Sequence, residues 1–241
     1  MMKIWNIASW SIGIVLILVL AAFSSQKIGE VQFHDIDIQV DYGQNHYFVT
    51  KAEINEMVRK EYPYLDSILI REINITLLEE TLDNHPSIRK AEVYSALDGI
   101  LRIHVQQKQP CYRVHNSTRD YYIAEKGDTM VLSPNYSAKV PLVTGKLSAE
   151  TTHKVYEFFK SIKKDEFFGN FFTGIDVDDN GGWTLYPKPG NHKVILGEPE
   201  NLDEKLRRLK IFYQSVIDKK NIDSIASLNL TYDKQVICKK Y

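Results

Sequence analysis

An uncharged apolar run opens the chain. Residues 4–26 carry no charged side chain, and residues 12–23 are almost wholly aliphatic. A helix of about 20 apolar residues, rising about 1.5 Å per residue, crosses the hydrocarbon core of a bilayer, which is about 30 Å thick. The pattern therefore predicts a transmembrane helix at residues 4–24, preceded by a cytoplasmic tail at residues 1–3.

A cleaved signal peptide is the alternative to a permanent anchor. Ala22-Phe23-Ser24 has small residues at the positions that flank a cleavage site. The apolar run is longer than that of a usual signal peptide, which favours the anchor. Lys3 is the only charged side chain before the run, and the positive-inside rule then favours a cytoplasmic amino terminus with the bulk of the chain outside the cytoplasm.

The next hydrophobic patterns predict a strand followed by two helices. Residues 36–40 alternate apolar and polar side chains, which is the period of a half-buried strand. Thr50, with Glu53 three residues later, is typical of a capping box that opens a helix. Asn74 is a candidate cap for a second helix, which His85-Pro86 closes.

A hairpin follows these helices. Residues 91–94 and 100–106 favour strands, and Asp98-Gly99 between them is a strong turn signal. The order strand, helix, helix, strand, strand then ends at Pro110.

The remainder of the chain predicts further hairpins and two more helices. The predicted elements are strands at 121–123, 130–132, 140–143, 175–177, 183–186, 193–196, 225–232 and 235–240, with helices capped by Ser148 and Asn201. Asp233-Lys234 is predicted as a two-residue turn between the last two strands, although it lacks the glycine that such turns prefer.

Composition and motifs argue against several classes of function. The 30 basic and 31 acidic side chains nearly cancel, so no global field attracts nucleic acid. No metal-ligand spacing, phosphate-binding loop or nucleophile motif occurs, so we expect no catalytic residue, metal, cofactor or small-molecule substrate. Cys111 and Cys238 match no zinc spacing; two thiols are favoured, and a disulfide is the alternative.

Three blocks of the sequence resemble one family of bacterial division proteins, FtsQ/DivIB. They comprise residues 82–94 with 99–105 and Gln109-Pro110, similar to the family's POTRA domain; residues 121–127 with 141–145, similar to the start of its β domain; and residues 228–232, similar to its penultimate strand. POTRA patterns also occur in outer-membrane assembly and secretion proteins, but the order of anchor, POTRA and β domain is that of FtsQ.

The resemblance implies an α+β chain in three parts. An amino-terminal transmembrane helix precedes a POTRA domain of order β-α-α-β-β at residues 28–108. Residues 109–241 are then expected to form an FtsQ-type β domain, a mixed α/β domain with an extended antiparallel sheet.

The resemblance also implies function. A protein of this family is a non-enzymatic, single-pass scaffold of the bacterial inner membrane, placed at the division septum, that binds FtsB/FtsL-type proteins and helps control septal wall synthesis. Its last strand accepts a strand from FtsB. By resemblance, the partner-binding residues are Tyr232, Gln235, Val236, Ile237, Cys238, Lys239 and Lys240.

The sequence predicts two sheet edges at which another strand could add. Lys239 and Lys240 favour an acidic partner, but lysines at an edge strand also protect against aggregation. The POTRA domain is expected to offer a second edge near residues 91–94.

Two other classes of function are alternatives. A periplasmic POTRA chaperone for outer-membrane assembly or secretion would use the same edge pairing on unfolded substrates. A secreted hydrolase with an unrecognised site would depend on residues such as His104, His115 or Asp176.

Overall fold

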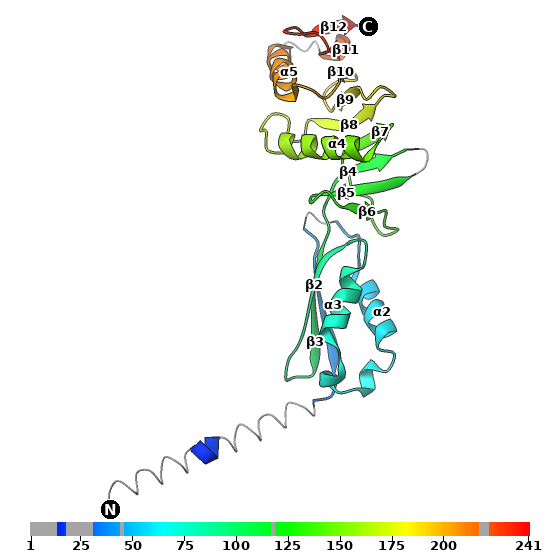
Figure 1. Ribbon diagram of the computed structural model, residues 1–241, viewed down its shortest axis with the longest axis vertical. Coiled ribbons are helices and arrows are strands. Elements are labelled where there is room, and N and C mark those ends of the chain that lie inside the picture. Colours follow the sequence, from blue (N-terminus) through cyan, green and yellow to red (C-terminus); the bar gives the residue numbers. More distant parts are fainter. Residues whose placement is uncertain (1–13, 18–30, 44–45, 117–118, 217–221) are drawn as a thin grey trace, which may run out of the picture. The chain divides into compact units, whose positions relative to one another are not determined.

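The computed structural model describes residues 14–17, 31–43, 46–116, 119–216 and 222–241 and divides into two compact units, residues 1–107 and 108–241 (Figure 1). Within these residues, none of the helices has the length and apolar character that a membrane crossing requires. The helix predicted at residues 4–24 and the alternative cleavage site lie outside the described residues, apart from a helical turn at 14–17.

The first unit has the predicted order of elements. Its three-stranded sheet has the order β1-β3-β2, with β1 parallel and β2 antiparallel to β3. The elements are β1 (Asp35–Asp41), α2 (Lys51–Glu61), α3 (Ile75–Asp83), β2 (Ile88–Ser95) and β3 (Ile100–Gln107), with short 3₁₀ turns at Leu65–Ser67 and Ile70–Glu72. The β-α-α-β-β prediction is confirmed.

Local side-chain chemistry fixes the ends of these elements. Thr50 and Glu53 form the predicted capping box, and the Asn74 side chain accepts the N–H of Leu77. Gly99 closes the hairpin at φ 78°, and a Cβ there would lie 2.4 Å from the carbonyl oxygen of Gln32, so only glycine fits. The apolar faces of both helices and the sheet form one buried core.

The second unit is a large sheet with two helices. Nine strands follow the order β12-β11-β10-β9-β8-β7-β4-β5-β6. The elements are β4 (Pro110–His115), β5 (Asp120–Ala124), β6 (Thr129–Val131), β7 (Leu142–Gly145), α4 (Ala149–Ile162), β8 (Phe172–Val177), β9 (Trp183–Pro187), β10 (Lys193–Gly197), α5 (Leu202–Val216), β11 (Ile225–Asn229) and β12 (Ile237–Lys240), with a 3₁₀ turn at Ile222–Ser224.

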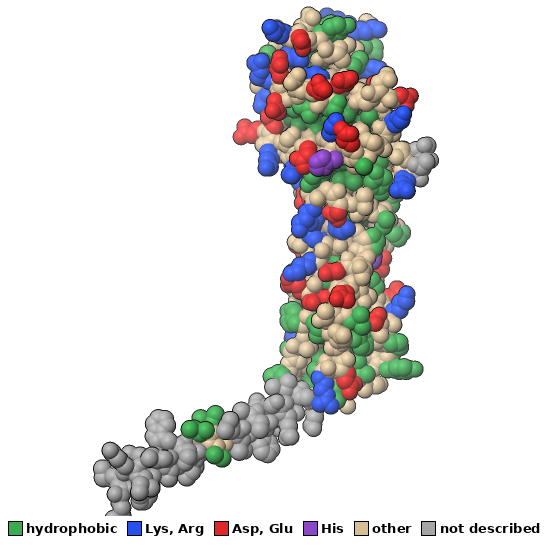
Figure 2. All heavy atoms as spheres, viewed as in Figure 1, with side chains coloured by type: hydrophobic (Ala, Val, Ile, Leu, Met, Phe, Trp, Pro, Cys, Tyr) green, Lys and Arg blue, Asp and Glu red, His purple; other side chains and the backbone are tan. Residues whose placement is uncertain are grey.

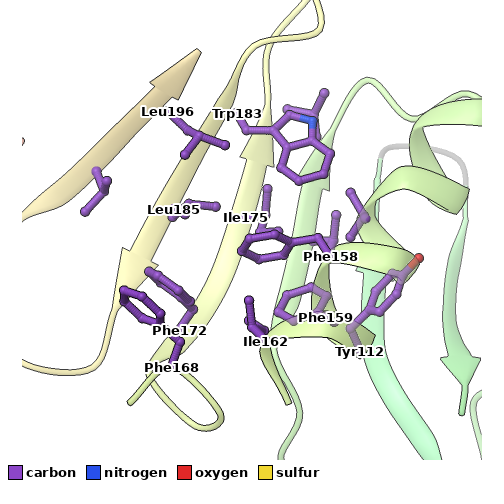
Figure 3. Close-up of a cluster of buried hydrophobic side chains, with 14 of the residues drawn as sticks. Tyr112, Phe158, Phe159, Ile162, Phe168, Phe172, Ile175, Trp183, Leu185 and Leu196 are labelled. Carbon is purple, nitrogen blue, oxygen red and sulfur yellow. The ribbon is translucent and has the colours of Figure 1, made fainter. Parts of the chain in front are cut away.

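Aromatic side chains dominate the core of the second unit (Figure 3). Phe158 and Phe159 of α4 are buried against the sheet, and Phe158 meets Trp183 edge-to-face at 5.6 Å between ring centroids. Burying one such side chain stabilises a fold by about 1.5–3 kcal/mol. Phe168 and Phe172 are buried too, so both rings belong to the core.

One prediction for this sheet is wrong, and one of its strands is absent from the predicted elements. The sheet is mixed, not antiparallel, because β7 is parallel to both β4 and β8, and β10 is parallel to β11. The helices explain two of these pairs: parallel neighbours need a crossover of a dozen or more residues, and α4 and α5 are such crossovers. Strand β4 is absent from the predicted elements, and it lies inside the sheet between β5 and β7.

The last hairpin also differs from its prediction. Strand β11 ends at Asn229, which pairs with Ile237, so residues 230–236 form a loop outside the ladder. The predicted two-residue turn is therefore wrong, although Lys234 has the left-handed φ of 59° that turns require. The N–H of Leu230 bonds the carbonyl of Ile195 instead, which continues the pairing toward β10.

Candidate partner-binding edge

Strand β12 ends the nine-stranded sheet. It pairs with β11 from Asn229–Ile237 to Ile225–Lys240, and no other described strand lies along its outer side. All four of its residues are exposed. An edge strand of this kind presents unpaired backbone groups to which another strand can add.

The backbone hydrogen bonds identify which groups face outward. The N–H of Tyr241 bonds the carbonyl of Ser224, on the β11 side. Because N–H groups alternate in direction along a strand, those of Ile237 and Lys239 also point to β11. Those of Cys238 and Lys240 then point away from the sheet.

Exposed apolar side chains accompany this free backbone. Tyr232, Ile237 and Tyr241 are 51%, 43% and 80% exposed. Lys239 and Lys240 stand beside them on the strand, and no ion pair among the described residues involves either one. The edge combines apolar anchors with positive charge.

The predicted partner-binding residues thus gather on one hairpin, but in three environments. Ile237, Cys238, Lys239 and Lys240 form the edge strand, Tyr232 and Gln235 lie in the loop before it, and Val236 is half-buried against the core. Val236 therefore belongs to the support of the edge.

Arg208 of α5 holds the loop before this strand. Its guanidinium donates to the carbonyl oxygens of Tyr232 at 2.6 Å and Gln235 at 2.8 Å, with a longer contact to Leu230 at 3.5 Å. Hydrogen bonds from a charged donor contribute about 1.5–3 kcal/mol each to stability when they are well formed. We call these contacts of Arg208 the Arg208 clamp. They fix the path by which the chain enters β12.

Sequence patterns missed two residues of this site. Arg208 falls on the polar face of a predicted helix, and nothing local indicates that it reaches a loop more than 20 residues later. Tyr241 follows the predicted strand directly, and its aromatic side chain next to Lys240 is the signal that would have included it.

The edge of β2 in the first unit is different. Two of its outward N–H groups, those of Ala91 and Val93, bond the carboxylates of Asp83 at 2.6 Å and Glu79 at 2.9 Å. Both acids lie on α3, one turn apart. The second edge that the sequence predicted near residues 91–94 exists, but the chain's own side chains occupy these donors.

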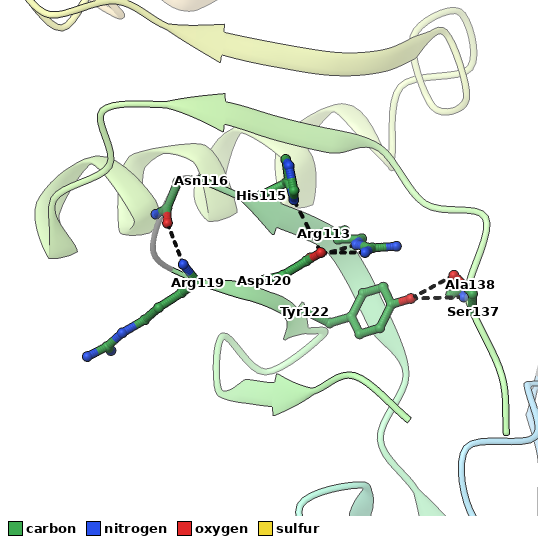
Figure 4. Close-up of polar contacts among 8 residues, drawn as sticks. All are labelled: Arg113, His115, Asn116, Arg119, Asp120, Tyr122, Ser137 and Ala138. Carbon is green, nitrogen blue, oxygen red and sulfur yellow. Dashed lines mark hydrogen bonds and ion pairs between the residues drawn. The ribbon is translucent and has the colours of Figure 1, made fainter. Parts of the chain in front are cut away.

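A polar cluster on β4 and β5 is structural (Figure 4). Arg113 donates to Asp120 through Nε at 2.7 Å and through a second nitrogen at 2.5 Å, and His115 lies 3.2 Å from the same carboxylate. Arg113 lowers the pKa of Asp120 to about 2, with a smaller effect from His115. Nearby, the buried Tyr122 accepts the N–H of Ala138 through its hydroxyl.

The residues suggested for a hydrolase lie on three different strands, β3, β4 and β8. His104 lies on β3 of the first unit, whereas His115 and Asp176 belong to the second. Asp176 accepts a hydrogen bond from Thr144, and His115 lies against Asp120. In the described part of the chain no group of three or more His, Cys, Asp or Glu side chains could hold a metal ion.

Both cysteines are free thiols in the structure. Burial raises the pKa of the Cys111 thiol, with a smaller opposing effect from Lys163. Cys238 is exposed on β12.

Comparisons with known protein families agree with this architecture. A family model described as FtsQ/DivIB, C-terminal related, matches residues 109–239, and a model of the POTRA-like domain matches residues 32–106. No curated protein matches the sequence.

The β-α-α-β-β unit matches the POTRA-like model and the large mixed sheet matches the FtsQ/DivIB-related model, so the two units together define a POTRA-bearing protein of the division-protein class. The FtsQ/DivIB-related model covers more than half of the chain. The chain belongs to the FtsQ/DivIB family, and its two matched regions are those of an FtsQ/DivIB-type protein. This membership associates it with cell division.

Proposed function

We propose that this protein is a single-pass division scaffold that captures an FtsB/FtsL-type partner by strand addition to β12. The helix expected at residues 4–24 anchors it in the inner membrane, and the rest of the chain lies outside the cytoplasm at the septum. Binding, and not turnover, is its mechanism. By holding its partners at the septum, it helps control septal wall synthesis.

The single observation that supports this proposal is the outer side of β12, along which no described strand lies. Strand addition supplies main-chain hydrogen bonds to the N–H groups of Cys238 and Lys240, and pockets for alternate side chains give specificity. Burial of Tyr232, Ile237 and Tyr241 under the partner adds the apolar contribution that backbone pairing lacks. Aromatic side chains are frequent energetic anchors of interfaces.

The positive charge of this edge predicts the charge of the partner segment. Lys239 and Lys240 favour a segment with acidic side chains flanking its strand, which raises the rate of encounter and fixes orientation. Edge protection alone would not require exposed apolar side chains next to the lysines. This combination supports docking over protection.

Truncation after Tyr232 tests the proposal. The full chain and the truncated chain are mixed with purified FtsB/FtsL-type partners, and affinity is measured by calorimetry. Loss of the edge strand is expected to weaken binding by at least about 100-fold, or about 2.7 kcal/mol. Thermal unfolding checks that the second unit remains folded. Equal affinity of a folded truncated chain would reject the proposal.

A periplasmic POTRA chaperone is the second candidate. Such a protein would capture unfolded substrate strands, and the POTRA-like first unit would be the site of capture. The occupied N–H groups of Ala91 and Val93 weigh against capture at β2. We therefore place the chaperone second.

A further inference from the structure

We infer that the second unit has another docking surface, a groove between α4 and α5 that takes a basic, amphipathic segment of a partner protein. This α4–α5 groove is defined by Phe158, Leu202 and Leu206 on its floor and by acidic side chains on its rim. It lies on a helical face of the unit and uses no residue of β12.

Sheet topology explains why the groove exists. Strands β7 and β10 run in the same direction, and each is followed by a helix that leads to the next parallel strand on the same side. Right-handed crossovers then put α4 and α5 on one face of the sheet, side by side and parallel.

Strand spacing leaves the two helices too far apart to pack closely. The centre of the β7–β8 pair lies three strand spacings from that of β10–β11, which is about 14 Å at about 4.8 Å per strand. Helices in contact lie about 8–10 Å apart. The helices are therefore separated by a trough above β9 that admits side chains.

The trough is a measurable hollow with an apolar floor. Its main part encloses about 690 Å³ and is bordered by Phe158, Leu202 and Leu206. A hollow of about 290 Å³ adjoins it through Lys154 and Pro199, and one of about 320 Å³ adjoins it through Leu206. On the face drawn in Figure 2, hydrophobic side chains show between charged ones in the region of α4 and α5.

The rim charge selects a basic occupant. Among the described residues that border the three hollows, the basic side chains are Lys154, Arg207 and Lys210; Lys154 pairs with Glu150 at 2.7 Å and Lys210 with Asp165 at 3.5 Å. The acidic side chains on the same rim outnumber them and are Glu150, Glu157, Asp165, Glu198, Glu200, Asp203 and Glu204. This excess favours lysine or arginine on the partner and disfavours an anionic lipid surface.

An unpartnered donor at the same place points to a ligand independently. Trp183 of β9 borders the hollow of 290 Å³ and is 1% exposed, and its indole nitrogen has no hydrogen-bond acceptor. Figure 3 shows that nitrogen on the side of the ring turned away from Phe158. A buried donor without an acceptor is costly, so a partner carbonyl that reached it would gain a strong hydrogen bond.

A synthetic probe tests the inference. The probe is a fluorescein-labelled, helical Leu-Lys peptide of about 14 residues, or about four turns. It is titrated into the full chain, into Asp203→Asn/Glu204→Gln, and into Glu56→Gln/Glu61→Gln, which removes the same charge from exposed positions on α2 of the first unit. The groove variant is expected to bind about tenfold more weakly than the full chain, whereas the control binds within about twofold.

A second readout separates the groove from general charge attraction. Peptide binding is expected to shift the indole N–H resonance of Trp183, assigned through Trp183→Phe, and to be unchanged in Cys238→Pro, which alters the edge of β12. Equal weakening by both charge variants, an unmoved Trp183 resonance, or loss of binding in Cys238→Pro would each overturn the inference. Because β12 is not involved, this result is independent of the proposed docking of FtsB/FtsL-type partners.

Discussion

The edges of β2 and β12 are both ends of sheets, yet the chain treats them differently. At β2, two carboxylates from α3 accept the outward N–H groups of Ala91 and Val93. At β12, no described strand pairs with the outward backbone, exposed tyrosines flank it, and Arg208 fixes the loop that leads into it. Proteins commonly block edges that would otherwise pair with other chains.

The difference shows that a strand at the edge of a sheet is not necessarily a docking site for another strand. Both edges carry apolar and charged side chains, so composition alone does not distinguish them. What distinguishes them is the neighbouring helix: α3 brings acceptors to β2, whereas α5 brings a donor to the loop before β12. Four predictions follow this contrast from the largest effect to the smallest.

Proline at position 238 should give the largest effect. Cys238→Pro removes one outward N–H and blocks strand addition, and proline is tolerated on the outer side of an edge strand. We expect a loss of about 100-fold in affinity for FtsB/FtsL-type partners, or about 2.7 kcal/mol. Calorimetry measures the affinity, and circular dichroism checks the fold.

The matched control for this change is Cys238→Ser. Serine keeps the N–H and changes only the side chain, so affinity should stay within about threefold, or about 0.6 kcal/mol. If serine and proline weakened binding equally, the side chain and not the backbone would carry recognition.

Loss of the clamp should have the next largest effect. Arg208→Ala leaves the carbonyls of Tyr232 and Gln235 without their donor, so the loop and β12 lose their fixed path. We expect about tenfold weaker partner binding and a loss of about 1–3 kcal/mol in the free energy of unfolding. The exposed neighbour gives the control, Arg207→Ala, which should leave both quantities nearly unchanged. A clamp variant that binds like the wild type would remove Arg208 from the site.

Removing the carboxylates that protect the edge of β2 should have a smaller effect. The quantity affected is the stability of the fold. Glu79→Ala and Asp83→Ala each free one N–H on β2, at a cost of about 1 kcal/mol in the free energy of unfolding. Amide exchange at Ala91 and Val93 should become faster, whereas Glu80→Ala on the exposed side of α3 should change neither. Unchanged exchange would mean that these carboxylates do not protect the edge.

Acid should produce the smallest effect, at the opposite end of the large sheet. The pKa of Asp120 is about 2 in the folded protein, below its ordinary value of 3.8. A lowered carboxyl pKa contributes stability above the unfolded value, and that contribution is lost as pH falls from about 4 to about 2. Asp120→Asn should remove about 1 kcal/mol of this dependence, without changing partner affinity at neutral pH. An equal slope in both proteins between these pH values would contradict the assignment.

Much of the first unit could be predicted from the sequence because its signals are local. The Thr50–Glu53 capping box, the Asn74 cap and the glycine turn at Gly99 each depend on residues within a few positions of one another.

Strand β4 of the second unit was missed because it begins at Pro110, directly after the previous strand, with no turn signal between them.

Long-range features of the second unit escaped the same reasoning. The helices between residues 140–143 and 175–177, and between 193–196 and 225–232, were already predicted. A helix between two neighbouring strands of one sheet favours a parallel crossover, so the antiparallel prediction overlooked a signal that was available. By contrast, two features depend on tertiary placement alone. They are the Arg208 clamp on the last loop and the carboxylates that accept outward N–H groups of β2.

Amide hydrogen exchange in the full chain, with and without an FtsB/FtsL-type partner, tests the central claim most directly. In the free protein, the amides of Ala91 and Val93 should exchange slowly, and those of Cys238 and Lys240 should exchange fast. Partner binding should slow Cys238 and Lys240 by at least about tenfold and leave Ala91 and Val93 unchanged. Protection that appears at β2, or a bound partner that leaves β12 exchanging as fast as before, would contradict strand capture at the carboxy-terminal edge.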